Sequence, residues 1–214
     1  MKKNYMMKTL TISGFAQDPN LISENLDIPS TSLDYQKISP SKIEELLKEF
    51  TNFDVVHAWS LGTLIAINYA HILKPKKLVL YAPIYQYLES ADFPHGITKQ
   101  EFNLFQQKLA EDEQEWFNYF CLLIAKGSPE FRARAKKLRS FDVKDLKYKK
   151  EWLTYLAMTQ ANLDNIKNIE TEIYHGLNDH IVSPKQSEYI KQQVTGTTLN
   201  LLKNKGHTCF ARDL

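Results

Sequence analysis

Three residues far apart in the chain, Ser60, Asp179 and His207, are of the types that cooperate in nucleophilic catalysis. A serine hydroxyl becomes a useful nucleophile when a base takes its proton, and an imidazole titrates close to neutral pH, so His207 is the candidate base. Asp179 would accept the other ring N–H of His207, fix its tautomer and stabilise the imidazolium. Asp164 also precedes His207 and competes for the acid role, but it falls in a stretch with a helical pattern. The chemistry that this set supports is acyl transfer through a serine.

The segment around Ser60 reads as a strand, a tight turn and a helix. An apolar run over residues 53–56 leads into His57-Ala58-Trp59-Ser60-Leu61-Gly62, and a helical pattern follows to about Leu73. Such a turn lifts the serine hydroxyl above a sheet and points a helix N-terminus at the reacting oxygen. The usual motif is Gly-x-Ser-x-Gly, and Ala58 replaces its first glycine. The alternative interpretation is that Ser60 only caps the helix.

The two partners also follow strand-like segments. Asp179 lies in a glycine-containing turn after residues 172–175, and His207 follows residues 198–202. The chain order serine, aspartate, histidine is the order of α/β-hydrolases. An oxyanion needs two preorganised donors, and we expect them to be the backbone N–H groups of Leu61 and of Phe15, which follows the first predicted strand.

The remaining pattern predicts an α/β protein with the α/β-hydrolase fold, in which a mainly parallel sheet is flanked by helices and carries a helical lid insertion. We expect a single domain over residues 1–214, with the core at 1–88 and 166–214 and the lid at about 89–165. Strands are predicted at residues 9–12, 53–57, 77–81, 172–175 and 198–202, with a short one possible at 32–37, and helices at residues 40–50 and around 184–193.

Composition bounds the remaining possibilities. The chain has 214 residues and a formal net charge of +2, which does not favour nucleic acid as a partner. It contains no apolar run long enough to span a membrane, and its basic N-terminus lacks the apolar region of a signal peptide. Cys121 and Cys209 do not suggest a disulfide framework, and Cys209 is an unlikely nucleophile while Ser60 fills that role. We therefore expect a cytoplasmic enzyme without metal, cofactor or membrane contact.

Three segments of the chain resemble those of a known family of esterases. The segments Ser13-Gly14-Phe15-Ala16, Ala58-Trp59-Ser60-Leu61-Gly62 and Gly206-His207-Thr208-Cys209-Phe210 are similar to those of pimeloyl-[acyl-carrier-protein] methyl ester esterases of biotin synthesis. The likeness extends in kind and spacing to the lid, through Gly96-Ile97, residues 105–109 and the arginine-rich stretch 132–139. It implies hydrolysis of the methyl ester on a pimeloyl chain carried by acyl carrier protein. The chain departs from the family at Ala58, at Thr208-Cys209 in place of a small residue and proline, and in its short length.

The lid contains a basic stretch whose residues include Arg132, Arg134, Lys136, Lys137 and Arg139. Arg132, Lys136 and Arg139 are spaced to share one helix face. Together with the family resemblance, this face favours binding of an acidic carrier protein and its phosphopantetheine phosphate. The alternative is an ordinary solvated helix face.

Aromatic residues recur at helical spacing in the lid, and most of them must pack the lid together. Some are candidates for the walls of an acyl pocket, and we name Phe15, Trp59, Phe117 and Phe120. Two other functions remain open: a broad short-chain carboxylesterase or thioesterase with the same triad, and a binding protein of this fold without turnover, against which the intact triad argues.

Overall fold

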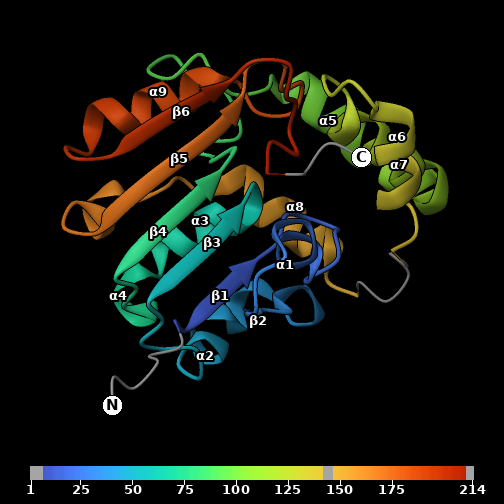
Figure 1. The fold of residues 1–214 in the computed structure, drawn as a ribbon. Coiled ribbons are helices and arrows are strands. Elements are labelled where there is room, and N and C mark those ends of the chain that lie inside the picture. Colours follow the sequence, from blue (N-terminus) through green and yellow to red (C-terminus); the bar gives the residue numbers. More distant parts are fainter. Residues whose placement is uncertain (1–6, 142–146, 211–214) are drawn as a thin grey trace.

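In a computed structural model, which describes residues 7–141 and 147–210, the chain is built around a six-stranded sheet with the strand order β2-β1-β3-β4-β5-β6 (Figure 1). All five strand pairings are parallel. Parallel strands place their carboxyl ends, and the loops that follow them, at one edge of the sheet. The strands are β1 (Thr9–Ile12), β2 (Thr31–Ser32), β3 (Val55–Trp59), β4 (Lys77–Tyr81), β5 (Glu170–Gly176) and β6 (Thr198–Leu202).

Helices cover the sheet and extend beyond its carboxyl edge. In Figure 1, α3, α4 and α9 lie behind the sheet, α1 lies in front of it near β1, and α5, α6 and α7 gather above one corner. The helices are α1 (Leu21–Leu26), α2 (Ile43–Leu47), α3 (Leu61–Asn68), α4 (Ala70–Leu73), α5 (Lys99–Glu111), α6 (Glu113–Ala125), α7 (Phe131–Leu138), α8 (Lys149–Met158) and α9 (Pro184–Gln193). None of the helices in the described parts of the chain is long and apolar enough to cross a membrane.

One face of the centre of the sheet is apolar and closely packed. Leu10, Val56, Leu80 and Ile173, one from each of four neighbouring strands, point to that face and are fully buried. The opposite face is less completely covered, and residues of β3, β4 and β5 border a hollow of about 600 Å³ there. The strand that leads into Ser60 is paired along both edges, by β1 and by β4.

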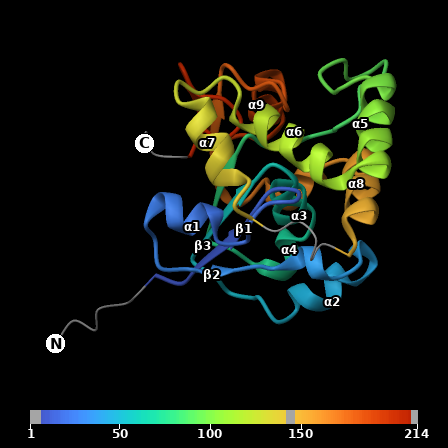
Figure 2. The same cartoon turned by 90° about the vertical axis from the view of Figure 1, so that its right-hand side faces the viewer.

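The lid consists of α5, α6 and α7, which follow β4 and precede β5 in the chain. In Figure 2 these helices lie above the labelled strands β1, β2 and β3. A reciprocal capping box between Thr98 and Glu101 starts α5, and the Asp112 side chain caps α6. Both caps satisfy backbone N–H groups that have no partner within the helix. The caps and the apolar contact between α5 and α6 make this a stable helical layer.

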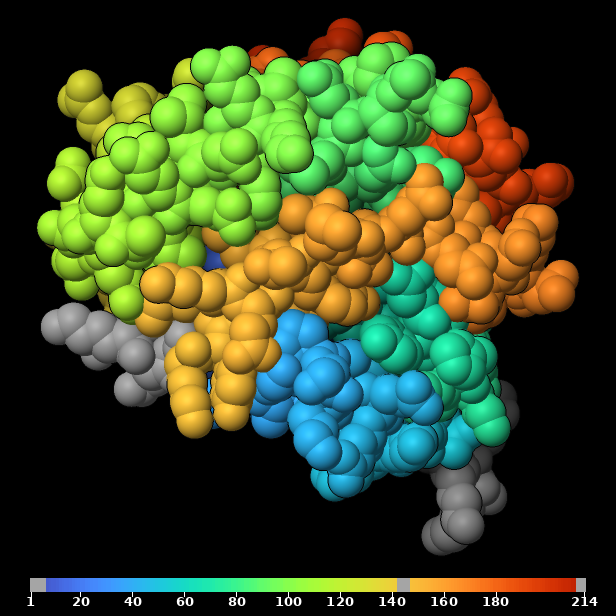
Figure 3. Space-filling model, turned by 180° about the vertical axis from the view of Figure 1, so that it is seen from behind, coloured from blue at the N-terminus to red at the C-terminus, as the bar shows by residue number. Residues whose placement is uncertain are grey.

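Helix α8 does not belong to that layer, although we expected the lid to extend to about residue 165. Trp152 of α8 is fully buried, its ring centroid lies 4.7 Å from that of Tyr35, and its Nε1–H donates to the carbonyl of Ile38 at 2.9 Å. Seen from behind, the orange segment that contains α8 lies between the green lid and the blue residues near α2 (Figure 3). The lid sequence thus returns to the core before β5 begins.

Two other predicted helices are interrupted. The helix expected over residues 40–50 begins as a short 3-10 turn, Pro40–Lys42, and continues as α2. The helix after Ser60 breaks at Tyr69, where α3 ends and α4 starts. Such junctions depend on local backbone angles, which hydrophobic periodicity does not specify.

Gly62 is the point at which α3 comes closest to β1. A Cβ at this position would lie 2.2 Å from the carbonyl oxygen of Ile12 and 2.7 Å from that of Ser13. Both obstacles are backbone atoms, so they cannot move aside as a flexible side chain could. Ala58, which replaces the first glycine of the usual motif, is fully buried, and its methyl group is accommodated there.

We therefore expect Gly62→Ala to lower the free energy of unfolding by about 2 kcal/mol or more, because the added methyl group must push α3 away from β1. Ala58→Gly is the matched control and should cost only about 1 kcal/mol, through backbone entropy. Urea denaturation followed by tryptophan fluorescence measures both values. A Gly62→Ala midpoint equal to that of the unsubstituted protein would contradict the close approach.

Candidate active site

Ser60 has the strained backbone of a sharp strand-to-helix turn. Its φ is 53° and its ψ is −123°, and its N–H donates to the carbonyl of Tyr81 at 3.1 Å. A non-glycine residue in such a conformation stores about 1–3 kcal/mol, which the surrounding structure must supply. The Ser60 side chain makes no capping hydrogen bond to α3. The structure therefore does not show the helix-cap role that was the alternative interpretation of this residue.

The loop after β1 lies directly against the elbow. A Cβ on Gly14 would lie 2.9 Å from the Trp59 ring and 3.3 Å from Cβ of Ser60, so only glycine lets the loop come this close. Within the described residues, no acceptor is found for the backbone N–H of Phe15 or of Leu61. Both residues are buried, and buried N–H groups are rarely left unpaired. Two such donors beside a serine are what an oxyanion hole requires.

Asp179 and His207 are in contact although 27 residues separate them along the chain. The Nδ1 atom of His207 lies 2.7 Å from Oδ2 of Asp179, and both side chains are almost fully buried. The other carboxylate oxygen accepts the backbone N–H groups of Ile181 at 2.8 Å and Val182 at 3.0 Å. Asp164 is an exposed residue that pairs with Lys167, so the structure places Asp179, and not Asp164, beside His207.

The surroundings keep Asp179 ionised. Burial by itself would raise the pKa of Asp179, but the charge of His207 and the hydrogen bonds from His175 and His207 hold this pKa well below its ordinary value. A carboxylate that stays ionised can orient the His207 ring and stabilise its protonated form.

Trp59 holds the loop that carries His207. Its indole Nε1–H donates to the carbonyl of His207 at 2.9 Å, and the centroids of the two rings are 5.2 Å apart. Because Trp59 directly precedes Ser60, this contact brings the base next to the elbow. In the described part of the chain no hydrogen bond joins Ser60 Oγ to His207, and such bonds are often long until a substrate is bound. We had expected Trp59 to line the acyl pocket. It is instead only 1% exposed, and its indole holds the loop of His207.

The lid touches the loops of both Asp179 and His207 through close backbone contacts. A Cβ on Gly127 would lie 1.9 Å from the carbonyl oxygen of Asn178, next to Asp179, and a Cβ on Gly206 would lie 2.2 Å from the carbonyl oxygen of Lys126. The turn between α6 and α7 therefore packs against the residues that directly precede the acid and the base.

A cleft of about 310 Å³ opens between α5, α6 and the loop after Asp179. Phe120 lines this cleft and packs against Phe15, with ring centroids 5.9 Å apart, so it connects the cleft to the expected oxyanion loop. Phe117 is 1% exposed and is not among the residues that line this cleft. Sequence reasoning missed most of the walls, which include Tyr87, Ile97, Glu101, Leu104, Phe105, Lys108, Tyr119, Leu123, His180 and Ile181.

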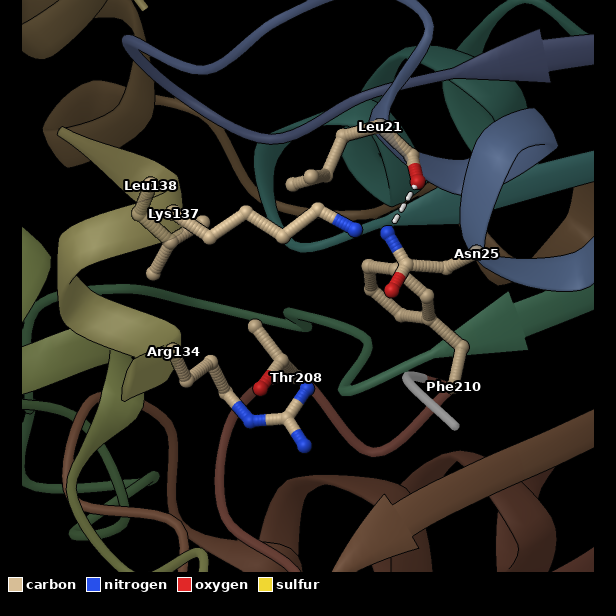
Figure 4. Close-up of a pocket in the computed structure, with 7 residues that line it drawn as sticks. All are labelled: Leu21, Asn25, Arg134, Lys137, Leu138, Thr208 and Phe210. Atoms are coloured by element: carbon tan, nitrogen blue, oxygen red, sulfur yellow. Dashed lines mark hydrogen bonds between the residues drawn. The ribbon is translucent and has the colours of Figure 1, made fainter. Parts of the chain in front are cut away.

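The basic residues of α7 divide into two groups. Arg132, Lys136 and Arg139 are exposed, and Arg139 also donates to the carbonyl of Asn118 at 3.2 Å. Arg134 is only 6% exposed and, with the exposed Lys137, extends into a pocket beside Thr208 and Phe210 (Figure 4). The structure thus removes Arg134 from the expected carrier-binding surface. The basic residues of the lid sequence continue beyond α7, and one of them, Lys144, lies outside the described residues.

His175 is the residue that sequence reasoning missed at the centre of the site. It is fully buried at the end of β5, and its Nε2 lies 3.1 Å from Oδ2 of Asp179. The available signal was a histidine in a predicted strand, four residues before the aspartate. Within the described residues no group of three or more His, Cys, Asp or Glu side chains is arranged to hold a metal ion.

Solved structures define the class of fold. An esterase from Exiguobacterium antarcticum superposes with a TM-score of 0.80 at 18% sequence identity, covering 96% of this chain and 86% of that chain. A hydrolase from Oleispira antarctica superposes with a TM-score of 0.73 at 16% identity, covering 96% of this chain and 85% of that one. The fold is that of the α/β-hydrolases, as predicted.

Two curated proteins of related sequence share the name of one particular esterase. The chain is 27% identical over 173 residues to a pimeloyl-[acyl-carrier protein] methyl ester esterase of Nitrosomonas europaea, covering 72% of this chain and 64% of that protein. The protein of the same name from Nitrosospira multiformis is 24% identical over 180 residues, covering 81% of this chain and 68% of that protein. The chain thus spans about two thirds of these relatives. No family model matches it.

We expect Asp179→Asn to lower kcat for p-nitrophenyl butyrate by about 10⁴-fold, because an amide favours the wrong tautomer of His207. Steady-state kinetics on the folded variant measures the loss. Asp164→Asn is the matched control and should behave as the unsubstituted protein does. The assignment would be wrong if the two variants had similar activity.

Proposed function

We propose that this chain is a serine carboxylesterase that uses Ser60 as nucleophile, His207 as base and Asp179 as acid. The observation that carries the proposal is the buried 2.7 Å contact between His207 and Asp179, tied to the serine elbow through Trp59. It leaves Nε2 of His207 without a hydrogen-bond partner in the described residues, as a base acting on Ser60 requires.

The proposed reaction has two halves. Ser60 Oγ attacks the ester carbonyl while its proton passes to Nε2 of His207, and the oxyanion is stabilised by the N–H groups of Phe15 and Leu61. The intermediate collapses when His207 gives its proton to the departing alcohol, which leaves an acyl-serine. Water then attacks this acyl group while His207 takes its proton. The second tetrahedral intermediate collapses as His207 passes that proton to Ser60 Oγ, which breaks the bond between Oγ and the acyl carbon and releases the carboxylic acid.

The proposed substrate is the methyl ester of a pimeloyl chain carried by acyl carrier protein, and methanol is then the departing alcohol. The curated relatives bear this activity in their names, which supports its transfer to this chain. The cleft under the lid is lined largely by apolar and aromatic side chains, which suits a methylene chain. The exposed cations of α7 suit an acidic carrier protein. Release of the carboxylate would end chain elongation and commit the acyl group to biotin synthesis.

The second candidate is a short-chain carboxylesterase or thioesterase without a carrier. It would use the same triad but would not need the basic face of α7. Because Arg134 is buried, α7 offers a carrier one exposed cation fewer than expected, which favours this alternative.

Ser60→Ala should lower kcat for p-nitrophenyl butyrate by about 10³-fold or more without unfolding the protein, because the acyl-serine can no longer form. Near-normal turnover by the purified variant would mean that Ser60 is not the nucleophile.

The biological substrate is tested by growth without biotin of a bacterial strain that lacks its own pimeloyl-carrier methyl ester esterase. The unsubstituted chain should restore growth and Ser60→Ala should not. An active esterase that fails to restore growth would favour the short-chain alternative.

The carrier proposal predicts that reversing the charge of Arg132 and Lys136 lowers kcat/KM for the carrier-bound methyl ester, and that the loss shrinks as salt is added, because exposed charges act by steering. Hydrolysis of p-nitrophenyl butyrate should be nearly unchanged, since that small ester needs no contact outside the site.

Lys48→Glu with Lys74→Glu is the matched control for this variant. It changes the net charge equally, at exposed positions just after α2 and just after α4, at the end of the molecule away from the lid (Figure 1). Equal loss on both esters in the Arg132 and Lys136 variant would show that α7 only supports the lid. No loss on either would show an ordinary solvated face.

A further inference from the structure

His175 has an unambiguous hydrogen-bonding pattern on one side of its ring. Its Nε2 lies 3.1 Å from Oδ2 of Asp179 and 3.0 Å from the carbonyl oxygen of Val182. A carboxylate and a carbonyl oxygen are both acceptors, so Nε2 must carry the hydrogen. On the opposite side, Nδ1 lies 2.6 Å from the hydroxyl of Ser187 on α9. In the neutral ring, Nδ1 accepts the Ser187 hydrogen.

Asp179 consequently serves two imidazoles through one oxygen. Oδ2 accepts from Nδ1 of His207 at 2.7 Å and from Nε2 of His175 at 3.1 Å, while Oδ1 accepts two backbone N–H groups. Four donors fix the plane of this carboxylate. Each donor also draws on the negative charge that stabilises the protonated form of His207.

We propose that His175 is a positioning residue that holds the Asp179 carboxylate in place and limits how strongly it favours protonation of His207. Ser187 acts through His175, because a hydrogen bond accepted at Nδ1 makes the Nε2–H a better donor. The inference rests on the proposed Ser60–His207–Asp179 triad and adds to it a second histidine, on the far side of the carboxylate.

Two buried ionisable groups that feel the charge of Asp179, Cys209 and Tyr87, cannot produce a response near neutral pH. The exposed His180 directly follows Asp179 and is present in every protein compared below, so its contribution cancels. Burial, followed by the charge of Asp179, raises the pKa of Cys209 to about 12. Burial, then Asp179, then Glu101 also raise the pKa of Tyr87 well above its ordinary value. Both groups therefore stay protonated over the working pH range, and Ser187, which faces His175 from α9, does not titrate there.

Two amide substitutions separate the contact with Asp179 from the packing of a buried ring. In His175→Gln the side-chain amide reaches the position of Nε2 and can still donate to Asp179. In His175→Asn it is one methylene shorter, so it reaches Ser187 but not the carboxylate. Circular dichroism and thermal melting establish that each variant is folded.

We expect the acidic limb of kcat/KM for p-nitrophenyl butyrate, plotted against pH, to move to higher pH by about half a pH unit or more in His175→Asn. The reason is that a carboxylate that has lost a donor holds the His207 proton more strongly. His175→Gln should return the limb toward that of the unsubstituted protein. Ser187→Ala leaves the buried His175 ring in place. It should move the acidic limb in the same direction as His175→Asn does, but by a smaller amount. Superimposable limbs in all folded variants, even with a lower kcat, would overturn the proposal.

Titration of the His207 ring by NMR in the same proteins keeps this test separate from the proposed function. If Ser60→Ala retains activity but His207 still titrates at higher pH in His175→Asn, the triad chemistry is wrong and the linkage between the histidines stands. If Ser60→Ala is inactive and the titration of His207 is unchanged, only the role of His175 is wrong.

Discussion

The left-handed backbone of Ser60 is the constraint on which the rest of the site depends. A residue at φ 53° and ψ −123° is held there only because the chain on either side is fixed. β3 is paired on both edges, and α3 is pressed onto β1 at Gly62, where a side chain would strike two carbonyl oxygens. The same contact sets the loop after β1 against Ser60, so this packing places both the proposed nucleophile and the N–H groups of the expected oxyanion hole.

The opposite half of the site is organised by a single buried carboxylate. Burial of an ionised group is unfavourable unless donors surround it, and Asp179 has four. Those donors come from its own loop, from the end of β5 and from the loop after β6, so the charge also ties three segments together. The turn after α6 packs on the same loops through close approaches at Gly127 and Gly206, so the lid helps to position the proposed acid and base as well as forming a wall of the cleft.

Much of this arrangement could be predicted from the sequence because the sheet is regular and its loops carry distinctive residues. The strands at residues 9–12, 77–81 and 198–202 and the helix at 184–193 lie where periodicity placed them, and the structure pairs Asp179 with His207. The spacing of apolar residues could not show which side chains of the lid would be buried. Arg134 and Phe117 look like their neighbours in the sequence, yet Arg134 is buried beside a pocket and Phe117 is buried without lining the cleft. His175 was missed because a lone histidine in a predicted strand ordinarily signals only a hydrogen-bonded structural residue.

The central claim is that Ser60 is the activated nucleophile of this fold, and covalent labelling tests it most directly. The protein is treated with a fluorophosphonate that phosphonylates activated serines, and the modified peptide is located by mass spectrometry. The account predicts a single adduct on Ser60, formed much more slowly in Asp179→Asn. An adduct on another residue, or an equal rate in Asp179→Asn, would contradict it.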